Sequence, residues 1–146
     1  MADLKAEQIM VAVQAKITGL STTGSNVSRN RMYDIQDSEL PYLLLIQGED
    51  KVDGEFFNNI QIQSTFGFMV RAYIKQSTTI ETTLNQIRKE IHIAVMNDTT
   101  LGLAFSARVF PVAASAPKLE LAEKQYGYID LMFAVRYTYK LTDASI

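Results

Sequence analysis

The sequence predicts an α+β fold, a two-layer sandwich in which two helices pack on one face of a mostly antiparallel sheet. Two segments repeat apolar residues at helical spacing, and two long segments alternate apolar and polar residues, as half-buried strands do. Four elements that each have one apolar side can bury those sides together only if both helices lie on the same face of one sheet. We therefore expect residues 1–146 to form a single domain with the element order α-β-β-β-α-β-β.

The two predicted helices are residues 3–18 and residues 80–96. Asp3 is the expected N-cap of the first helix. Thr78 and Glu81 precede and open the second helix with the spacing of a capping box. The apolar stripes consist of Ile9, Val13 and Ile17 in the first helix, continued by Leu20 just after it, and of Ile80, Leu84, Ile87, Ile91 and Val95 in the second.

Five segments are predicted to be strands. The two longest alternate over their whole length, and a short apolar run before Gly48 is typical of a strand that is buried on both faces. Another is expected to end at Pro111, since proline lacks the N–H that a ladder needs. The predicted strands are residues 27–35, 42–46, 60–75, 101–112 and 126–141.

The segment 48–59 is predicted to be a loop or a hairpin tip. Its four acids, among them Glu49, Asp50 and Asp53, outnumber one lysine, so its net charge is −3. It also contains Phe56 and Phe57, apolar residues that a solvated loop would expose.

The alternation also predicts which side chains point away from the helices. That outward set is rich in tyrosine and methionine, which are enriched where proteins meet proteins. Long side chains or loops could cover these residues instead, and the two alternatives stay open here. The set includes Gln61, Gln63, Thr65, Met69, Arg71 and Tyr73 from one strand, and Tyr126, Tyr128, Asp130 and Met132 from the other.

The two longest strands exceed the expected diameter of the domain. Sixteen residues in a strand span about 50 Å, whereas a compact domain of this length is about 38 Å across. The strands must therefore bend, for which Gly67 is the obvious place, or their ends project. Projecting strand edges carry unpaired N–H and C=O groups that invite a neighbouring chain.

Composition excludes several classes of chemistry. The chain has no cysteine and one histidine, which rules out thiolate metal sites, disulfides and multi-histidine metal centres. His92 lies beside the apolar stripe of the second helix and is expected to be partly exposed rather than catalytic. The acids of residues 48–59 match no metal-binding pattern, and no glycine-rich phosphate loop is present. We therefore expect no enzymatic activity, no cofactor and no metal.

Charge and hydropathy restrict the partners. Fourteen basic and sixteen acidic residues give a net charge of −2, too balanced for binding nucleic acid by bulk electrostatics. The sequence contains no run of 18 apolar residues, so we expect no membrane span. Arg29 and Arg31 share one side of a predicted strand, where they could bind phosphate or could protect an exposed edge against aggregation.

Several stretches resemble the tail terminator (tail completion) proteins of long-tailed bacteriophages. The resemblance covers nearly the whole chain, and its motifs are hydrophobic patterns with a Leu-Pro dipeptide and a glycine-acid turn. The front half carries it in Arg29-x-Arg31-x-Tyr33, Glu39-Leu40-Pro41, Leu43 to Ile46 and Gly48-Glu49-Asp50. The back half carries it in Gly127 to Phe133, Val135 and Tyr137.

This resemblance implies a structural role in a virion. Members of the family form a hexameric ring that caps the tail tube, ends tube polymerisation and joins head completion proteins, while DNA passes through the lumen. Such a protein would lie at the head-proximal end of the tail, and in the host cytoplasm during assembly. The alternatives are another head–tail connector or neck protein, or a small-ligand binding module.

Two sets of residues are the candidates for these contacts. Uncharged polar side chains suit a lumen because they neither hold nor strongly repel phosphate. We expect the lumen to be lined by Gln61, Gln63 and Thr65. We expect subunit or tube contacts at Phe56, Phe57, Glu49, Asp50, Asp53, Arg29, Arg31, Tyr126 and Tyr128.

Overall fold

The computed structural model describes residues 3–29, 36–55, 61–75, 78–121 and 125–146. Two helices and six strands, with one short 3-10 helix, follow one another along the chain. They are α1 (Lys5–Ile17), β1 (Val27–Ser28), η1 (Asp37–Glu39), β2 (Tyr42–Glu55), β3 (Gln61–Lys75), α2 (Ile80–Met96), β4 (Ala107–Ala114), β5 (Lys118–Leu121) and β6 (Gln125–Lys140).

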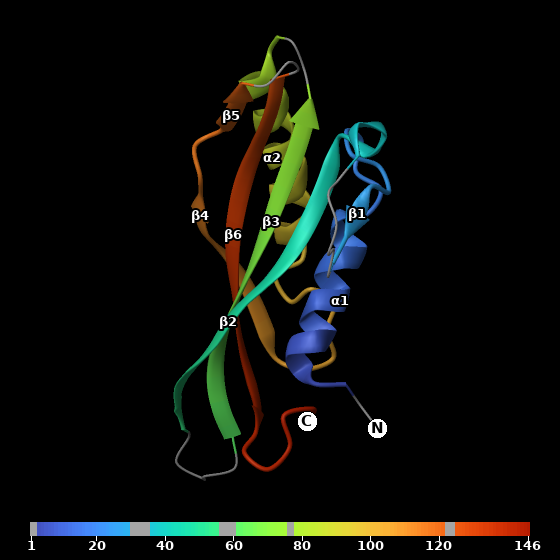
Figure 1. Cartoon of the computed structure of the whole chain (residues 1–146). Coiled ribbons are helices and arrows are strands. Elements are labelled where there is room, and N and C mark those ends of the chain that lie inside the picture. Colours follow the sequence, from blue (N-terminus) through green and yellow to red (C-terminus); the bar gives the residue numbers. More distant parts are fainter. Residues whose placement is uncertain (1–2, 30–35, 56–60, 76–77, 122–124) are drawn as a thin grey trace.

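The strands form one sheet with both helices on the same face. The spatial order is β1-β2-β3-β6-β4, and β5 pairs with β6 on the edge that β4 also occupies. The pairs are antiparallel, apart from the short parallel pair of β1 with β2. Figure 1 shows α2 and α1 behind and beside the long strands. The predicted α+β two-layer sandwich is thus confirmed.

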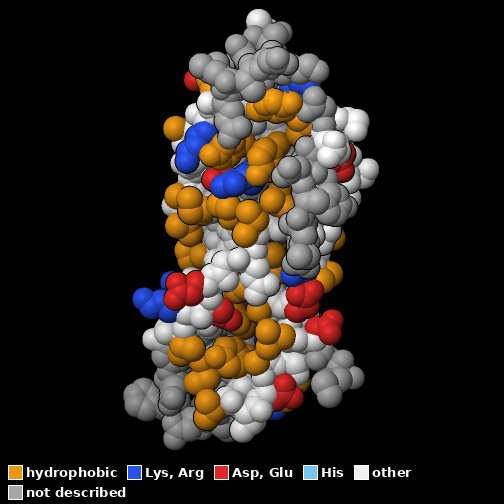
Figure 2. Space-filling view, viewed as in Figure 1, with side chains coloured by type: hydrophobic (Ala, Val, Ile, Leu, Met, Phe, Trp, Pro, Cys, Tyr) orange, Lys and Arg blue, Asp and Glu red, His pale blue; other side chains and the backbone are white. Residues whose placement is uncertain are grey.

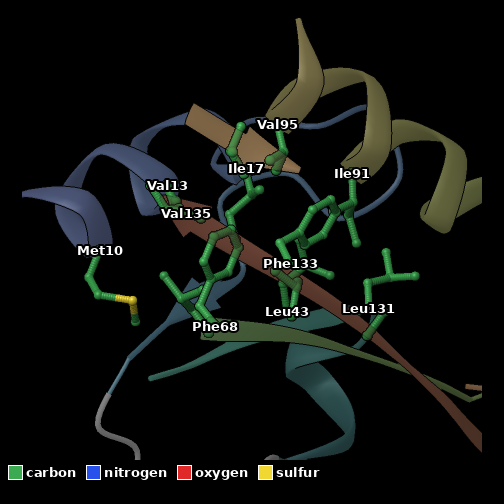
Figure 3. Packing of buried hydrophobic residues seen from close by; sticks show 14 of the residues in the cluster. Met10, Val13, Ile17, Leu43, Phe68, Ile91, Val95, Leu131, Phe133 and Val135 are labelled. Atoms are coloured by element: carbon green, nitrogen blue, oxygen red, sulfur yellow. The ribbon is translucent and has the colours of Figure 1, made fainter. Parts of the chain in front are cut away.

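The core lies between the helices and the inner face of the sheet. Every second residue of β3 from Ile62 to Ile74 is buried, as the alternation predicts. Figure 3 shows Met10, Val13 and Ile17 of α1 and Ile91 and Val95 of α2 directed at the same strands. The Phe68 ring of β3 stacks on the Phe133 ring of β6 with centroids 5.3 Å apart.

Both predicted helices form, but neither predicted cap does. The residue before α1 is Leu4, which makes no side-chain capping bond, so Asp3 is not the N-cap. The residue before α2 is Thr79, which has a left-handed backbone with φ of 58° and makes no capping bond either. The helices are therefore positioned by burial of their apolar stripes rather than by their ends.

The second strand is much longer than predicted. The expected strand 42–46 and the first part of the expected loop 48–59 form one element, β2, which pairs with β3 from Tyr42↔Tyr73 to Glu55↔Ile62. Prediction of a loop was therefore wrong for residues 48–55. The ladder with β3 overrides the poor strand propensity of glycine and aspartate.

Two further strands differ from prediction. In the predicted strand 27–35 the structure describes a strand only at Val27–Ser28, and residues 30–35 lie outside the described residues. The segment 101–106 is a turn in which Leu101 has a φ of 57°, so β4 starts only at Ala107. Pro111 lies within β4 at a register shift, where the ladder tolerates a missing N–H.

A bulge in β2 lets the long strands bend. The register with β3 shifts between Gln47 and Asp50, opposite Gly67. A Cβ atom on Gly48 would lie 2.7 Å from the carbonyl oxygen of Gly67, so this close approach requires glycine. Bulges increase the local twist, and Figure 1 shows β2 crossing in front of its neighbours in this region before the strands extend past the end of α1. The bend and the projecting end are thus both present.

Candidate interaction surface on the outer face of the sheet

The outer face of the sheet, which points away from the helices, carries the predicted outward side chains. Gln61 is exposed, and Gln63 and Thr65 are partly exposed, because their buried neighbours Ile62 and Ser64 face the other way. The predicted orientation of these three side chains away from the helices is confirmed.

An ion pair bridges the two central strands on this face. Arg71 of β3 and Asp130 of β6 are direct register partners. Two guanidinium nitrogens, Nε and Nη2, donate to the two carboxylate oxygens over 2.6 Å and 3.0 Å. Asp130 is only 7% exposed, and its carboxylate is the main cause that raises the pKa of Arg71 above its usual value. The bidentate geometry fixes the register of these strands.

Tyrosine rings and cations surround this ion pair. Tyr73 and Tyr128 have ring centroids 5.9 Å apart, and the Arg71 guanidinium lies 4.8 Å from the Tyr128 centroid. Lys118 lies on Tyr128 at 5.8 Å, and Lys75 lies on Tyr126 at 5.6 Å. The predicted contact residues Tyr126 and Tyr128 therefore already have cationic neighbours within the chain.

Next to this cluster lies an apolar groove. The directly opposed pair Gly67 and Ala134 forms its floor, because neither has a side chain large enough to fill it. Its volume is about 460 Å³. Met132 is 39% exposed and Val112 is 59% exposed. We define the apolar groove by Ile46, Gly67, Met69, Val112, Met132 and Ala134, and Glu49, Lys51 and Thr65 also border it.

Two unpaired arginines follow the groove towards the end of the sheet where β2 meets β3. Arg108 of β4 and Arg136 of β6 are direct register partners, and both are exposed. Arg136 lies 5.7 Å from the Phe110 ring centroid. Neither arginine makes an ion pair within the described residues. They border a recess of about 240 Å³ together with Gln63, Ser106 and Thr138.

The three predicted acidic contact residues lie on strand β2 and point in different directions. Glu49 borders the apolar groove and has no polar partner among the described residues. Asp53 accepts a hydrogen bond from the Thr65 hydroxyl and so also lies on the outer face. Asp50 accepts hydrogen bonds from Ser64 and Tyr137, which belong to the inner face. The structure therefore does not bring the three carboxylates together.

The Asp50 network belongs to the protein interior. Ser64 and Tyr137 are buried, and burial, followed by the Asp50 hydrogen bond, raises the pKa of the Tyr137 phenol. Nearby, Lys5 donates a hydrogen bond to the Thr138 carbonyl over 2.7 Å. Burial, followed by the charge of Lys140, lowers the pKa of Lys5. These contacts tie the strand ends to α1.

Arg29 fastens β1 to the first helix. Its two terminal nitrogens donate to both carboxylate oxygens of Glu7 over 2.9 Å and 3.0 Å. This hydrogen bonding lowers the pKa of Glu7. The Arg29 guanidinium is therefore already paired within the chain, and its predicted contact with a partner stays a prediction. The predicted contact residues Arg31, Phe56 and Phe57 lie outside the described residues.

The described residues contain no group that resembles a catalytic or metal centre. His92 is exposed on α2 beside a shallow recess along β4, as expected. No three metal-ligating side chains converge in the part of the chain that the structure describes. Over the same residues, no helix is both long and apolar enough to cross a bilayer.

Figure 2 shows how these features are distributed over one side of the molecule. Apolar side chains gather in an upper and a lower area, and a band of acidic and basic side chains separates the two. Within the upper area, basic and acidic side chains lie among apolar ones.

Sequence reasoning missed the two arginines and the apolar groove. The alternation of β6 places Arg136 outward, but the predicted strand 101–112 starts earlier than β4 and gives no indication that Arg108 lies opposite Arg136. Which residues face one another depends on strand register, which periodicity does not determine. The pairing of Arg108 with Arg136, and of Gly67 with Ala134, became visible only in the assembled sheet.

No known family model and no curated protein sequence matches this chain.

Proposed function

We propose that this chain is a structural subunit of a bacteriophage tail, a terminator that assembles into a ring on the tail tube. In this role it ends tube polymerisation and presents a joining surface to head completion proteins. The proposal rests on the resemblance of the sequence to tail terminator proteins, together with a surface suited to protein contact. It includes a place at the head-proximal end of the virion tail and no catalytic activity.

The observation that carries the proposal is the outer face of the sheet. Met132 and Val112 expose much of their apolar area beside a groove that is almost wholly apolar. Monomeric proteins cover such surface, and contiguous apolar patches rimmed by charge are typical of contact sites between proteins. The charged side chains of Glu49 and Lys51 lie at the border of the groove.

The central strand β3 supplies the proposed lumen lining. Gln61, Gln63 and Thr65 point away from the helices, with uncharged polar ends. If this part of the outer face borders the channel, DNA passes without being held by these side chains. In this proposal DNA moves through the channel without being specifically bound.

A small-ligand binding module is the second candidate. The volume of the apolar groove, about 460 Å³, lies in the range of ligand pockets. However, such sites orient a ligand with several convergent polar groups, whereas Gly67 and Ala134 form the floor of this groove and its surface is mostly apolar, with Glu49, Lys51 and Thr65 at the border. The lining therefore favours a protein partner.

Electron microscopy of tails assembled with and without this chain tests the proposal. A terminator predicts tails of uncontrolled length in its absence. Tails of normal length that lack heads would instead identify a connector or neck protein. Normal headed tails would overturn any role in this part of the virion, and a shift in melting temperature with small metabolites would then support the module.

The double substitution Phe56→Ser with Phe57→Ser addresses the predicted contact of these two residues. We expect it to impair assembly while the fold remains intact, because aromatic residues in a segment predicted to be a loop or hairpin tip should contribute to association rather than to the core. Ring or tail formation is measured by negative-stain microscopy, and folding by circular dichroism. Normal assembly by the double variant would refute the contact.

A further inference from the structure

Arg108 and Arg136 form an uncompensated cationic site on the outer face. Like charges directly opposite each other on neighbouring strands destabilise a sheet. Elsewhere on the same face the fold avoids this cost, since Arg71 is paired with Asp130. No acidic side chain of the described residues pairs with Arg108 or Arg136. The cost is offset if an anionic partner occupies the site.

The charge distribution of the sheet indicates which partner fits. On the outer face, β2 carries the acids Glu49 and Asp53 with Lys51 between them in the chain, whereas Asp50 points inward. Towards the opposite edge of the sheet, β4 contributes one arginine, and residues 132–140 of β6 contribute one arginine and one lysine. Together these two segments have a net charge of +3. The two regions are separated by β3. The acidic side chains of β2 in one copy are thus complementary in charge to the arginines of β4 and β6 in a second copy.

The two regions also lie along edges of the sheet. The described pairing of β1 with β2 covers only Leu43 and Leu44, so the second half of β2 has β3 on one side and no described strand on the other. β4 ends the sheet on the other side. A side-by-side contact between copies brings the β2 edge of one copy to the β4 edge of the next.

We propose that a second copy of this chain binds side by side, with Glu49 and Asp53 of one copy against Arg108 and Arg136 of the next. We call the first pair the acidic flank and the second pair the arginine flank. The inference deepens the proposed function by naming the surfaces between ring subunits.

The geometry of this contact makes it propagate. Each copy uses two different surfaces. A row of bound copies therefore keeps one free flank at each of its two ends until the ring closes. Within one copy the central strand β3, with Gln63 and Thr65, lies between the two flanks, so a contact along the two sheet edges leaves this strand open to the channel. A nucleic-acid backbone fits the site less well, because the molecule is acidic overall.

Charge reversal tests the contact. The mass of the wild-type chain and of the variant Arg108→Glu with Arg136→Glu is measured over a range of concentrations, with circular dichroism as the check on folding. We expect the variant to associate about tenfold more weakly or worse, because like charges then face each other. Wild-type association should also weaken as salt rises from about 0.05 M to about 0.5 M.

Two rescue experiments identify the partner surface. A chain that also carries Glu49→Arg and Asp53→Arg has the wild-type net charge and swapped flanks, and it should associate like the wild type. An equimolar mixture of the arginine-flank variant with a Glu49→Arg, Asp53→Arg chain should form mixed assemblies, since both alternating contacts then join opposite charges. Failure of both rescues would overturn the proposal.

Matched controls separate a local contact from net charge. Arg136→Glu is compared with Lys89→Glu, which changes the charge equally on the exposed side of α2 and should leave association unchanged. If the double glutamate variant does not fold, Arg108→Gln with Arg136→Gln replaces it and should still weaken association.

Other outcomes would overturn the inference in distinguishable ways. Wild-type assembly that the arginine variants leave unchanged refutes this contact but not the ring. A species that stops at two copies refutes a side-by-side contact. A wild-type chain that stays monomeric at every concentration refutes this self-association, whereas the ring on the tail tube is tested separately by the microscopy of tails. Binding of a duplex DNA fragment that is lost in the arginine variant, without self-association, would assign the site to phosphate instead.

Discussion

The Tyr137 hydroxyl ties the inner face of β6 to β2 through Asp50. Replacing it in Tyr137→Phe should lower the free energy of unfolding by about 1–2 kcal/mol, because Asp50 keeps only the Ser64 donor. Denaturant unfolding measures the change. Tyr139→Phe is the matched control, since the Tyr139 ring packs on Tyr137 but its hydroxyl makes no described hydrogen bond. Equal losses in both variants would contradict the role of the hydrogen bond.

The same phenol should make stability sensitive to alkaline pH. The folded state raises the pKa of Tyr137 above the unfolded value of 10.0. Its contribution is therefore complete below pH 10 and declines as pH rises towards the folded-state pKa. The melting temperature should fall more steeply with rising pH in this range for the wild type than for Tyr137→Phe. Parallel curves would contradict the raised pKa.

The Glu7–Arg29 pair should give the opposite dependence on pH. The folded state lowers the pKa of Glu7 below the unfolded value of 4.5, so its contribution is present above pH 4.5 and is lost as pH falls through the folded-state pKa. Glu7→Gln should cost no more than about 1 kcal/mol at neutral pH, because Glu7 is partly exposed. The difference in melting temperature from the wild type should vanish in acid, and a constant difference would refute this account.

Two glycines show how the elements constrain each other. Gly127 of β6 lies under the start of α2, where an added Cβ would lie 2.5 Å from Cγ2 of Ile80. Gly127→Ala should therefore destabilise the fold by about 1–3 kcal/mol, since the helix must move away from the sheet. Gly67→Ala is the control, because its Cβ would meet nothing closer than 3.7 Å. Thermal unfolding should show no loss for this second variant.

The long strands could be assigned by pattern only where one face is buried. From Ile62 to Ile74, burial by two helices enforces a strict alternation, and the prediction was accurate to one residue. The second half of β2 extends beyond that cover, where Glu49, Asp50 and Asp53 interrupt any pattern. Its strand structure comes from the ladder with β3, which is a tertiary contact.

The molecule as a whole has one face closed by helices and one face left open. If the open face meets another protein, placing a charge in the apolar groove should disrupt association without unfolding the chain. Met132→Lys tests this, because the side chain is 39% exposed and the substituted ammonium can reach solvent. Association should weaken about tenfold while the melting temperature changes little. Ile93→Lys on the exposed side of α2 is the control, and an equal effect there would contradict a specific role for the groove.

The apolar periodicities were enough to predict two helices on one face of a mostly antiparallel sheet. An element that is buried on one side repeats apolar residues at the fixed spacing of a helix or a strand. Helix ends, strand register and the partners of individual charges were not predictable in this way. The pairing of Arg71 with Asp130, and the exposure of Arg108 beside Arg136, depend on which residues of different strands lie opposite one another. That choice is made when bulges, helix packing and ladder hydrogen bonds are satisfied together, and so only the tertiary structure decides it.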